Sequence, residues 1–183
     1  MIPIITVEGP TASGKTAFAV ELAQRFDTQI ISADSRQVYK YCNIGTAKPS
    51  ENELWLVRHH LIDIITPDET YNAGLFRKDA SVIIDELNAK GKIPIICGGT
   101  GLYIKALLEG LFEADIYDKN IRTSLDNELY SKGLQALYDE LVDVDCNSAV
   151  NISKNDKQRI LRALEVYRAT GIPISEHWKS QLL

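Results

Sequence analysis

Hydrophobic residues gather in short runs along the first 110 residues, and stretches with helical spacing lie between these runs. The apolar runs predict four buried strands, at residues 2–7, 28–33, 60–64 and 93–97. Helical spacing begins near Ala17 and recurs at residues 51–57, 72–89 and 102–108, with Gly91 placed to end the third helix. Strands that alternate with helices predict an α/β fold, in which helices flank both faces of a parallel sheet.

The pattern changes after residue 111, where only helical spacing remains. Residues 118–132, 134–143 and 155–169 predict helices, with breaks at Gly133 and over residues 144–154. Asn155 is a favourable N-cap for the last of these helices. That helix has apolar residues at the spacing of a core contact, namely Ile160, Ala163, Leu164 and Tyr167.

These patterns predict the domain organisation. Residues 1–111 form the catalytic core, residues 112–170 a small helical insert domain, and residues 171–183 are expected to return towards the core. Four parallel strands are few for a fold of this type, so more chain is expected beyond Leu183.

The stretch Gly9-Pro10-Thr11-Ala12-Ser13-Gly14-Lys15-Thr16 lies between the first strand and the first helix. It matches G-x-x-x-x-G-K-[ST] in the strand–loop–helix context that gives this motif its meaning. Backbone N–H groups of such a loop converge on an anion, and the following helix adds the positive end of its dipole. Lys15 supplies a charge for the outer phosphate, and the Thr16 hydroxyl is placed to bind Mg²⁺. The motif predicts a site for a di- or triphosphate group in a P-loop NTPase-like sheet.

Composition narrows the choice of partners. Hydrophobic residues make up 45% of the chain and charged residues 25%, as in ordinary globular proteins. No apolar run approaches the ~20 residues of a membrane span, and the N-terminus lacks a signal-peptide pattern. Three cysteines without metal spacing predict free thiols in a reducing cytoplasm. The net charge of −5 argues against indiscriminate binding of nucleic acid, while a local basic surface is compatible with it.

Two loops join the P-loop at the carboxyl ends of the predicted strands, where open α/β sheets bind their ligands. Asp34 leaves the second strand beside the phosphate site, and its carboxylate could accept a proton or hold Mg²⁺ through water. The alternative is a loop residue that caps Ser35 or Arg36. Gly98-Gly99-Thr100-Gly101 follows the fourth strand. Its glycines indicate either a tight turn or close approach of the backbone to a ligand, and both remain open.

The last predicted helix carries a polar face. Arg159 and Arg162 lie three residues apart, and Gln158 lies four residues before Arg162. This face could bind the phosphates of a nucleic acid, and the alternative is a merely solvated face. A basic tract would need further residues to join it, namely Arg36, Lys48, Arg122, Lys154 and Lys157.

Several motifs appear in the order of one known family. Besides the P-loop they are residues 34–39 (DSRQVY), 45–49 (GTAKP), 60–63 (HLID), 71–76 (YNAGLF), 98–103 (GGTGLY), 155–159 (NDKQR) and 162–167 (RALEVY). Together they resemble the bacterial tRNA dimethylallyltransferase family, from about residue 4 to residue 176. The set is far more specific than the P-loop alone. Asp145-Cys146 departs from the Asp-Pro usual in this family, and family members continue well past residue 175.

The resemblance implies that the P-loop holds the diphosphate of dimethylallyl diphosphate rather than ATP. The dimethylallyl group would pass to the exocyclic N6 amine of an adenine next to the anticodon of tRNA, with Asp34 as general base and Mg²⁺ at Thr16. It also implies tRNA contacts from the segment Asp34-Ser35-Arg36-Gln37 and from Gln158-Arg159-Ile160-Leu161-Arg162. Thr100 and Arg122 would line the mouth of the reaction channel. A cytoplasmic enzyme, acting as a monomer without a membrane, is expected.

Three alternatives stay open at this point. A cytokinin-forming isopentenyltransferase acting on free adenine nucleotides would share the P-loop and Asp34 but should lack the helical insert. A P-loop kinase of small metabolites would need an arginine-bearing lid, of which the sequence shows no independent signature. The third alternative is a tRNA-binding fragment without catalysis.

Overall fold

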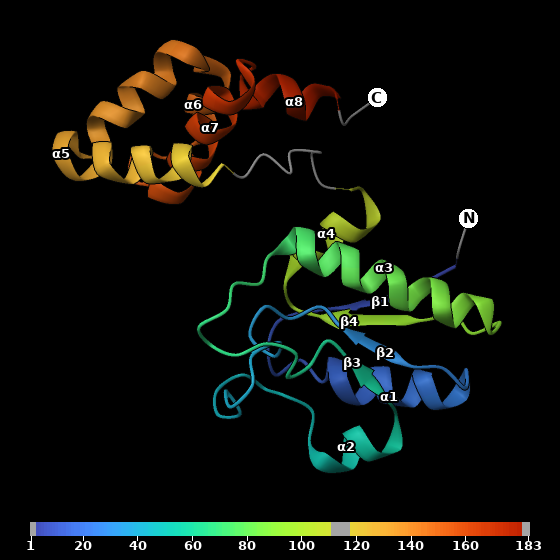
Figure 1. Ribbon diagram of the computed structural model, residues 1–183. Helices are drawn as coiled ribbons and strands as arrows, with labels where there is room; N and C mark the ends of the chain where they lie inside the picture. The colour runs from blue at the N-terminus through green and yellow to red at the C-terminus, as the bar shows by residue number, and fades with distance from the viewer. Residues whose placement is uncertain (1–2, 111–117, 181–183) are drawn as a thin grey trace. The chain divides into compact units, whose positions relative to one another are not determined.

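The computed structural model describes residues 3–110 and 118–180. The chain divides into two compact units, Met1–Leu111 and Phe112–Leu183 (Figure 1). The boundary expected between residues 111 and 112 lies outside the described residues, as do residues 181–183. Each unit has its own hydrophobic core, so each is described by itself.

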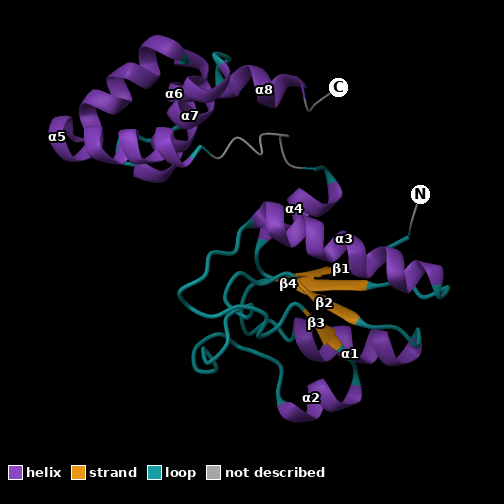
Figure 2. Ribbon diagram, in the orientation of Figure 1, coloured by secondary structure: helices purple, strands orange, loops and turns teal. Residues whose placement is uncertain are grey.

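A four-stranded parallel sheet forms the centre of the first unit (Figure 2). Its strands are β1 (Ile5–Glu8), β2 (Ile30–Ser32), β3 (His59–His60) and β4 (Ile95–Gly98), in the order β1-β4-β2-β3. β4 pairs with β1 on one side and with β2 on the other, and both pairings are parallel. All the strands therefore point their carboxyl ends at one edge of the sheet, and the P-loop follows β1 there.

Alternate side chains of the strands pack against opposite layers of helices. Ile31 and Ile96 belong to the core under α3 (Ala73–Ala89) and α4 (Gly101–Leu108). Ile30 and Ile95 belong to the core under α1 (Lys15–Arg25). Figure 1 shows α3 and α4 on one face of the sheet and α1 on the other. The predicted α/β architecture with helices on both faces is confirmed.

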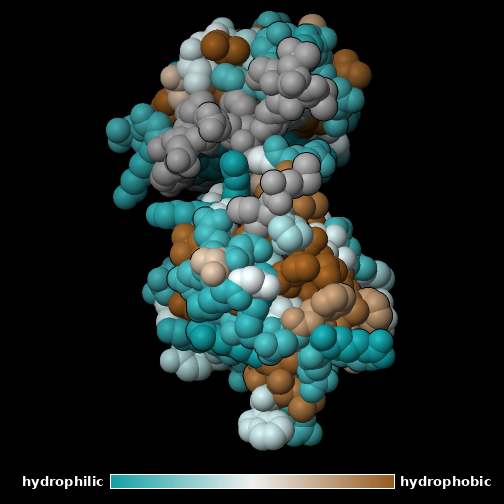
Figure 3. Space-filling view, turned by 90° about the vertical axis from the view of Figure 1, so that its right-hand side faces the viewer, coloured by the Kyte–Doolittle hydropathy of each residue, from teal (hydrophilic) through white to brown (hydrophobic). Residues whose placement is uncertain are grey.

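The helix boundaries away from the sheet edge follow local capping signals. The Asn72 side chain accepts a hydrogen bond from Leu75 N–H at 3.0 Å and starts α3, and Gly91 lies just beyond its end with a φ of 71°. Ser50 and Glu53 form a capping box at the start of α2 (Glu51–Leu56). α2 buries none of its residues. Hydrophobic side chains reach the surface in the lower part of the view in Figure 3. The exposed apolar residues of α2 are Leu54, Trp55 and Leu56.

The described part of the second unit is helical, with α5 (Lys119–Val144), α6 (Cys146–Asn151), α7 (Lys157–Thr170) and α8 (Ile174–Ser180). α5 bends at Gly133, whose φ of 82° and ψ of 168° are not helical, so the predicted break at this residue is confirmed. α5 and α7 enclose the core, which is built from Leu125, Leu137, Leu141, Ile160, Leu161 and Leu164. No helix in the described part of the chain combines the length and apolarity needed to cross a bilayer.

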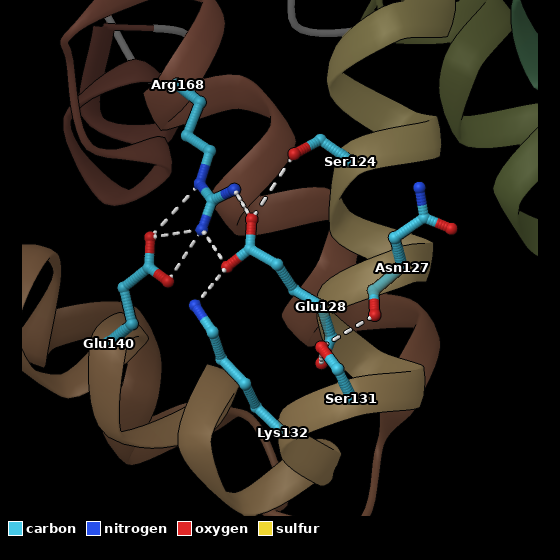
Figure 4. Close-up of polar contacts among 7 residues, drawn as sticks. All are labelled: Ser124, Asn127, Glu128, Ser131, Lys132, Glu140 and Arg168. Carbon is cyan, nitrogen blue, oxygen red and sulfur yellow. Dashed lines mark hydrogen bonds and ion pairs between the residues drawn. The ribbon is translucent and has the colours of Figure 1, made fainter.

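Arg168, in the last turn of α7, joins the two halves of α5 (Figure 4). Its guanidinium lies between the carboxylates of Glu128, before the bend, and Glu140, after it. Nε donates to Glu140 at 3.1 Å, and Nη2 donates to Glu140 at 2.7 Å and to Glu128 at 3.2 Å. Lys132 adds a second cation, 3.1 Å from Glu128. Hydrogen bonds from Arg168 lower the pKa of Glu128 to about 2.

Three predicted boundaries are wrong for identifiable reasons. The strand expected at residues 60–64 ends at His60, because Leu61 and Asp63 have positive φ values of 61° and 55°. The expected break over residues 144–154 contains α6, which is too short to show helical spacing and starts at the Asp145 cap. Asp156 caps α7 in place of Asn155, since its carboxylate accepts from Arg159 N–H at 3.1 Å.

The last helix belongs to the second unit. Residues 171–183 were expected to return towards the core of residues 1–111, whereas residues 174–180 form α8. Ile174 is buried in the core of the second unit. Ser175 N–H donates to the Asp145 carboxylate at 2.9 Å, which ties α8 to the start of α6.

Candidate functional site

The P-loop connects β1 to α1 as the motif predicts. Gly14 has a φ of 80° and precedes the first helical residue, Lys15. No side chain caps this helix, so the N–H groups of its first turn remain for an external acceptor. Lys15 Nζ donates to Pro10 O at 3.1 Å and thereby folds back over the loop. The arrangement suits an anion with several oxygens.

An open hollow lies over the P-loop. Residues 12–17 line one side of it, and Ala47, Lys48, Pro49 and Glu53 line the other. Lys48 is a brace here and not an anion contact, because its ammonium donates to Tyr39 O, Asn43 Oδ1 and Asp63 Oδ1 at 2.6–2.9 Å. These three bonds use all the hydrogens of the ammonium. Of the two lysines, Lys15 is therefore the one placed to meet a ligand.

The loops after β2 and β4 are held together by backbone contacts. Thr100 N–H donates to Ala33 O at 3.1 Å, and Ser35 N–H donates to Thr100 Oγ1 at 2.9 Å. A Cβ on Gly98 would lie 2.1 Å from Ala33 O, so Gly98 permits this close approach between neighbouring strand ends. A Cβ on Gly99 would lie 3.2 Å from Gly9 O and 4.0 Å from Lys15 Nζ. The structure thus assigns Gly98 to strand packing and places Gly99 against the P-loop.

Asp34 has one carboxylate oxygen bonded in a turn and the other without a partner in the part of the chain that the structure describes. Oδ1 accepts from Arg36 N–H at 2.8 Å and from Gln37 N–H at 3.4 Å. Oδ2 has no hydrogen-bond partner among residues 3–110 and 118–180. Asp34 shares a small inner hollow with Lys15 and Thr16. The turn role considered for Asp34 is confirmed, since Oδ1 accepts from Arg36 and Gln37, and Oδ2 remains available for a ligand.

The inner hollow also contains two residues whose roles the sequence did not predict. Gln37 is buried, and it accepts from Ser32 Oγ at 2.8 Å and donates to Ala47 O at 2.8 Å. The side-chain amide of Gln37 is thus occupied inside the fold, and its contact with tRNA stays a prediction. Cys97 lines the same hollow, and burial raises the pKa of its thiol to about 11, so it is a neutral wall of the site.

His59 is the residue that sequence reasoning missed. Adjacent residues of a strand face opposite ways, and the neighbouring His60 has its Nε2 2.7 Å from Gln29 Oε1. His59 instead lines the inner hollow with Thr16 and Asp34. Burial lowers the pKa of His59 below its usual range, so its ring is neutral at physiological pH. His59 is far from the P-loop in the sequence, and the pairing of β3 with β2 brings it near. No local sequence signal could have predicted this placement.

The residues fit Mg²⁺ that arrives with a phosphate-bearing substrate. No cluster of three or more metal-binding side chains occurs within the ranges 3–110 and 118–180. Mg²⁺ keeps several waters and takes one or two protein ligands together with phosphate oxygens. The Thr16 hydroxyl and the Asp34 carboxylate, which line one hollow, provide such a set.

The polar face of α7 is only partly as predicted. Gln158 and Arg159 are exposed, and Arg159 lies 3.5 Å from Asp156. Ile160 and Leu161 are fully buried in the core of the second unit, so a tRNA contact at these positions would involve their backbone and stays a prediction.

Arg162 and Arg122 are more enclosed than the sequence suggested. The Arg162 side chain is 39% exposed, and it donates to Glu165 at 3.0 Å. Arg122, predicted at the channel mouth, lies 3.5 Å from Asp126 on α5. Arg122 and Arg162 belong to the second unit. The other predicted tRNA contacts Ser35, Arg36 and Thr100 belong to the first.

Comparison of the sequence with known proteins gives consistent results. The profile of the family described as IPP transferase matches residues 37–182. A tRNA dimethylallyltransferase from Acinetobacter baumannii is 53% identical over 176 residues, which cover 96% of this chain and 56% of that protein. One from Syntrophobacter fumaroxidans is 48% identical, with 98% and 52% covered. The chain therefore spans about half the length of the curated relatives that it matches.

Solved structures agree with the sequence relatives. A tRNA isopentenylpyrophosphate transferase from Bacillus halodurans superposes with a TM-score of 0.62 at 40% identity, covering 94% of this chain and 57% of that one. A eukaryotic dimethylallyltransferase acting on tRNA superposes with a TM-score of 0.81 at 31% identity, covering 98% of this chain and 44% of that one. The matches extend over both units of the chain.

Proposed function

This chain belongs to the IPP transferase family, and from that membership and the site geometry we propose a reaction. The protein transfers a dimethylallyl group from dimethylallyl diphosphate to the N6 amine of an adenine next to the anticodon of tRNA, and diphosphate is released. One observation carries the proposal: Asp34 shares a hollow with Lys15 and Thr16 of the P-loop. A base for the amine thus lies beside a site for the leaving group.

The P-loop stabilises the departing diphosphate. Negative charge grows on the diphosphate as its bond to the allylic carbon breaks, so fixed donors aimed at it lower the barrier. The uncapped N–H groups at the start of α1 and the ammonium of Lys15 are such donors. Mg²⁺ held by the Thr16 hydroxyl would supply further charge stabilisation when bound.

Asp34 prepares the acceptor. An adenine amine is a poor nucleophile until it loses a proton, and a carboxylate within hydrogen-bond reach can take that proton. Oδ1 is fixed by the N–H groups of Arg36 and Gln37, which leaves Oδ2 to face the amine. The new carbon–nitrogen bond forms as the carbon–oxygen bond to diphosphate breaks, and the amine proton passes to Asp34.

The remaining predicted tRNA contacts come from exposed residues of both units. Arg36 is exposed next to Asp34, and Gln158 and Arg159 are exposed on α7. Ser35, Thr100 and Arg122 complete the proposed contacts, with Arg162 held by Glu165. The target adenine has to leave the anticodon-loop stack to reach Asp34, as in other enzymes that act on a base. We propose that one copy of the chain carries the site.

A transfer assay tests the proposal. The protein is incubated with Mg²⁺, tRNA and dimethylallyl diphosphate labelled in the dimethylallyl group, and the digested nucleosides are analysed by mass spectrometry. We expect label on adenosine from tRNA, and none with Asp34→Ala. Asp27→Ala is the matched control, because Asp27 is 93% exposed and pairs only with Lys92 among the described residues.

Companion assays with free adenosine monophosphate, with ATP and small metabolites, and with tRNA alone distinguish the alternatives. Label on free adenosine monophosphate in place of tRNA would indicate the cytokinin-forming activity. Transfer of the ATP γ-phosphate to a small metabolite would indicate a kinase. Binding of tRNA without transfer to any acceptor would favour the third alternative, a tRNA-binding fragment without catalysis.

A further inference from the structure

His59 has a defined tautomer in this fold. Its Nδ1 lies 2.9 Å from Val57 O, and a backbone carbonyl can only accept a hydrogen bond. Nδ1 therefore carries the proton, and Nε2 of the neutral ring presents a lone pair. Nε2 is buried and has no hydrogen-bond partner within the described ranges. Burial of an acceptor without a donor is unfavourable, so a donor is expected at this atom.

The hollow that His59 lines leaves one hydroxyl hydrogen available for a water-mediated link, that of Thr16. It is lined by Thr16, Ser32, Asp34 and Gln37, and it has room for about one water molecule. Ser32 Oγ already donates to Gln37 Oε1, so its hydrogen is in use. The Thr16 hydroxyl has one hydrogen and two lone pairs, and the direction of that hydrogen decides where the lone pairs point.

We propose that His59 is a positioning residue of the P-loop, and that its Nε2 accepts a hydrogen bond from a water molecule that also accepts the Thr16 hydroxyl hydrogen. This inference rests on the proposed function, since it gives a role to the metal and diphosphate site. The Thr16 hydrogen then points inward, so its oxygen lone pairs face Mg²⁺ and the diphosphate. Groups behind a metal ligand commonly fix its orientation in this way, and their loss lowers metal affinity about 10–100-fold.

The tautomer can be observed without any ligand. In the ¹⁵N-labelled protein, two-bond ¹H–¹⁵N correlations report which ring nitrogen of each histidine is protonated. The chain has three histidines, and His60→Gln and His177→Gln variants assign the signals. We expect a neutral His59 with hydrogen on Nδ1 and an accepting Nε2. A His59 ring protonated at Nε2 would overturn the proposal.

Binding of inorganic pyrophosphate tests the link to Thr16. Calorimetric titrations with and without Mg²⁺ compare the wild type with His59→Leu, which removes the acceptor, and His59→Gln, whose amide oxygen retains one. We expect His59→Leu to bind pyrophosphate about 10–100-fold more weakly with Mg²⁺ and nearly normally without it. His59→Gln should recover most of the loss. His60→Gln, on the neighbouring position of β3, is the control and should bind normally.

The outcomes separate this inference from the proposed reaction. Equal affinities for all variants, an equal loss with and without Mg²⁺, or a wild type whose pyrophosphate affinity ignores Mg²⁺ would each overturn the role of His59. Because no transfer is measured, a protein that shows the expected pattern but leaves tRNA unmodified would instead refute the proposed function. Should His59→Leu fail to fold, His59→Ala, which also removes the acceptor, is titrated in its place with the same expected loss, and equal affinity would again overturn the proposal.

Discussion

The two units start their helices differently. In the first unit, α1 and α4 follow directly from the carboxyl ends of β1 and β4, and no side chain caps either helix. In the second unit, α5, α6 and α7 each begin at an aspartate whose carboxylate accepts backbone N–H groups. The capping residues there are Asp118, Asp145 and Asp156.

This difference in capping distinguishes helix starts that can bind a ligand from helix starts that only stabilise the fold. Uncapped N–H groups are a reserve for an anionic ligand, and the two uncapped helices of the first unit are those at the sheet edge with the P-loop. Within the same unit, α2 and α3 do not start at the sheet edge from a strand end, and they are capped by Ser50 and Asn72. A helix whose first turn is satisfied internally offers its exposed face and not its end. We therefore expect changes near the P-loop to affect chemistry, and changes in the second unit to affect stability or RNA binding.

Asp34 provides the largest expected effect. Asp34→Asn keeps an oxygen for the N–H groups of Arg36 and Gln37 but removes the base. Transfer to tRNA should fall about 10²–10⁴-fold, while the affinity for the diphosphate and the melting temperature stay close to the wild type. Single-turnover kinetics and calorimetry measure the two quantities. Transfer at the wild-type rate would reduce Asp34 to a turn residue.

Gly98 tests the junction of the strand ends. Gly98→Ala places a Cβ 2.1 Å from Ala33 O, which neither backbone can relieve without moving a strand end. We expect a loss of about 3 kcal/mol in the free energy of unfolding, at the upper end for an overpacked core. Gly101→Ala is the matched control, since its Cβ would have no neighbour within 4 Å. Equal urea midpoints for the two variants would contradict this account.

Arg168 tests the support in the second unit. Arg168→Met leaves Glu128 and Glu140 without their shared cation, and we expect a loss of about 1–3 kcal/mol in the stability of this unit. Trp178 reports on it by fluorescence once Trp55 is replaced by Phe, because the chain has two tryptophans. Arg25→Met, which breaks the exposed pair with Glu21, is the control and should change stability by less than about 0.5 kcal/mol.

The same cluster predicts a pH dependence. The pKa of Glu128 is lowered to about 2 in the folded protein, so the unfolded chain binds its proton at higher pH. The stabilisation is therefore complete above the unfolded pKa of about 4.3 and is lost as the pH falls towards 2. Arg168→Met should flatten the stability profile in this window. An unchanged profile would show that the cluster contributes nothing measurable.

Arg159 gives the smallest effect on stability and the clearest test of RNA binding. Arg159→Ala removes a side chain that is 71% exposed, so stability should move by less than about 0.5 kcal/mol. The KM for tRNA should rise, and its logarithmic salt dependence should lose about one unit of slope. Arg25→Ala removes the same charge elsewhere. Arg162 is unsuited to this test, because its loss would leave the buried Glu165 without the partner at 3.0 Å.

Local signals predicted the fold and the P-loop, and long-range contacts account for what was missed. The strand–loop–helix motif and the Gly133 break depend on neighbouring residues, so the sequence shows them directly. The burial of Gln37 depends on contacts with Ser32 and Ala47, which only the folded loop brings together. Glu128 and Arg168 lie 40 residues apart, and no pattern in the chain links them.

The choice of ligand at the P-loop is the central claim, and a calorimetric titration tests it directly. Dimethylallyl diphosphate and ATP are each titrated into the protein with Mg²⁺. We expect dimethylallyl diphosphate to bind more tightly, because the chain belongs to the IPP transferase family and Asp34 lies in one hollow with Lys15 and Thr16 of the P-loop. Clearly tighter binding of ATP would contradict the account and favour a kinase.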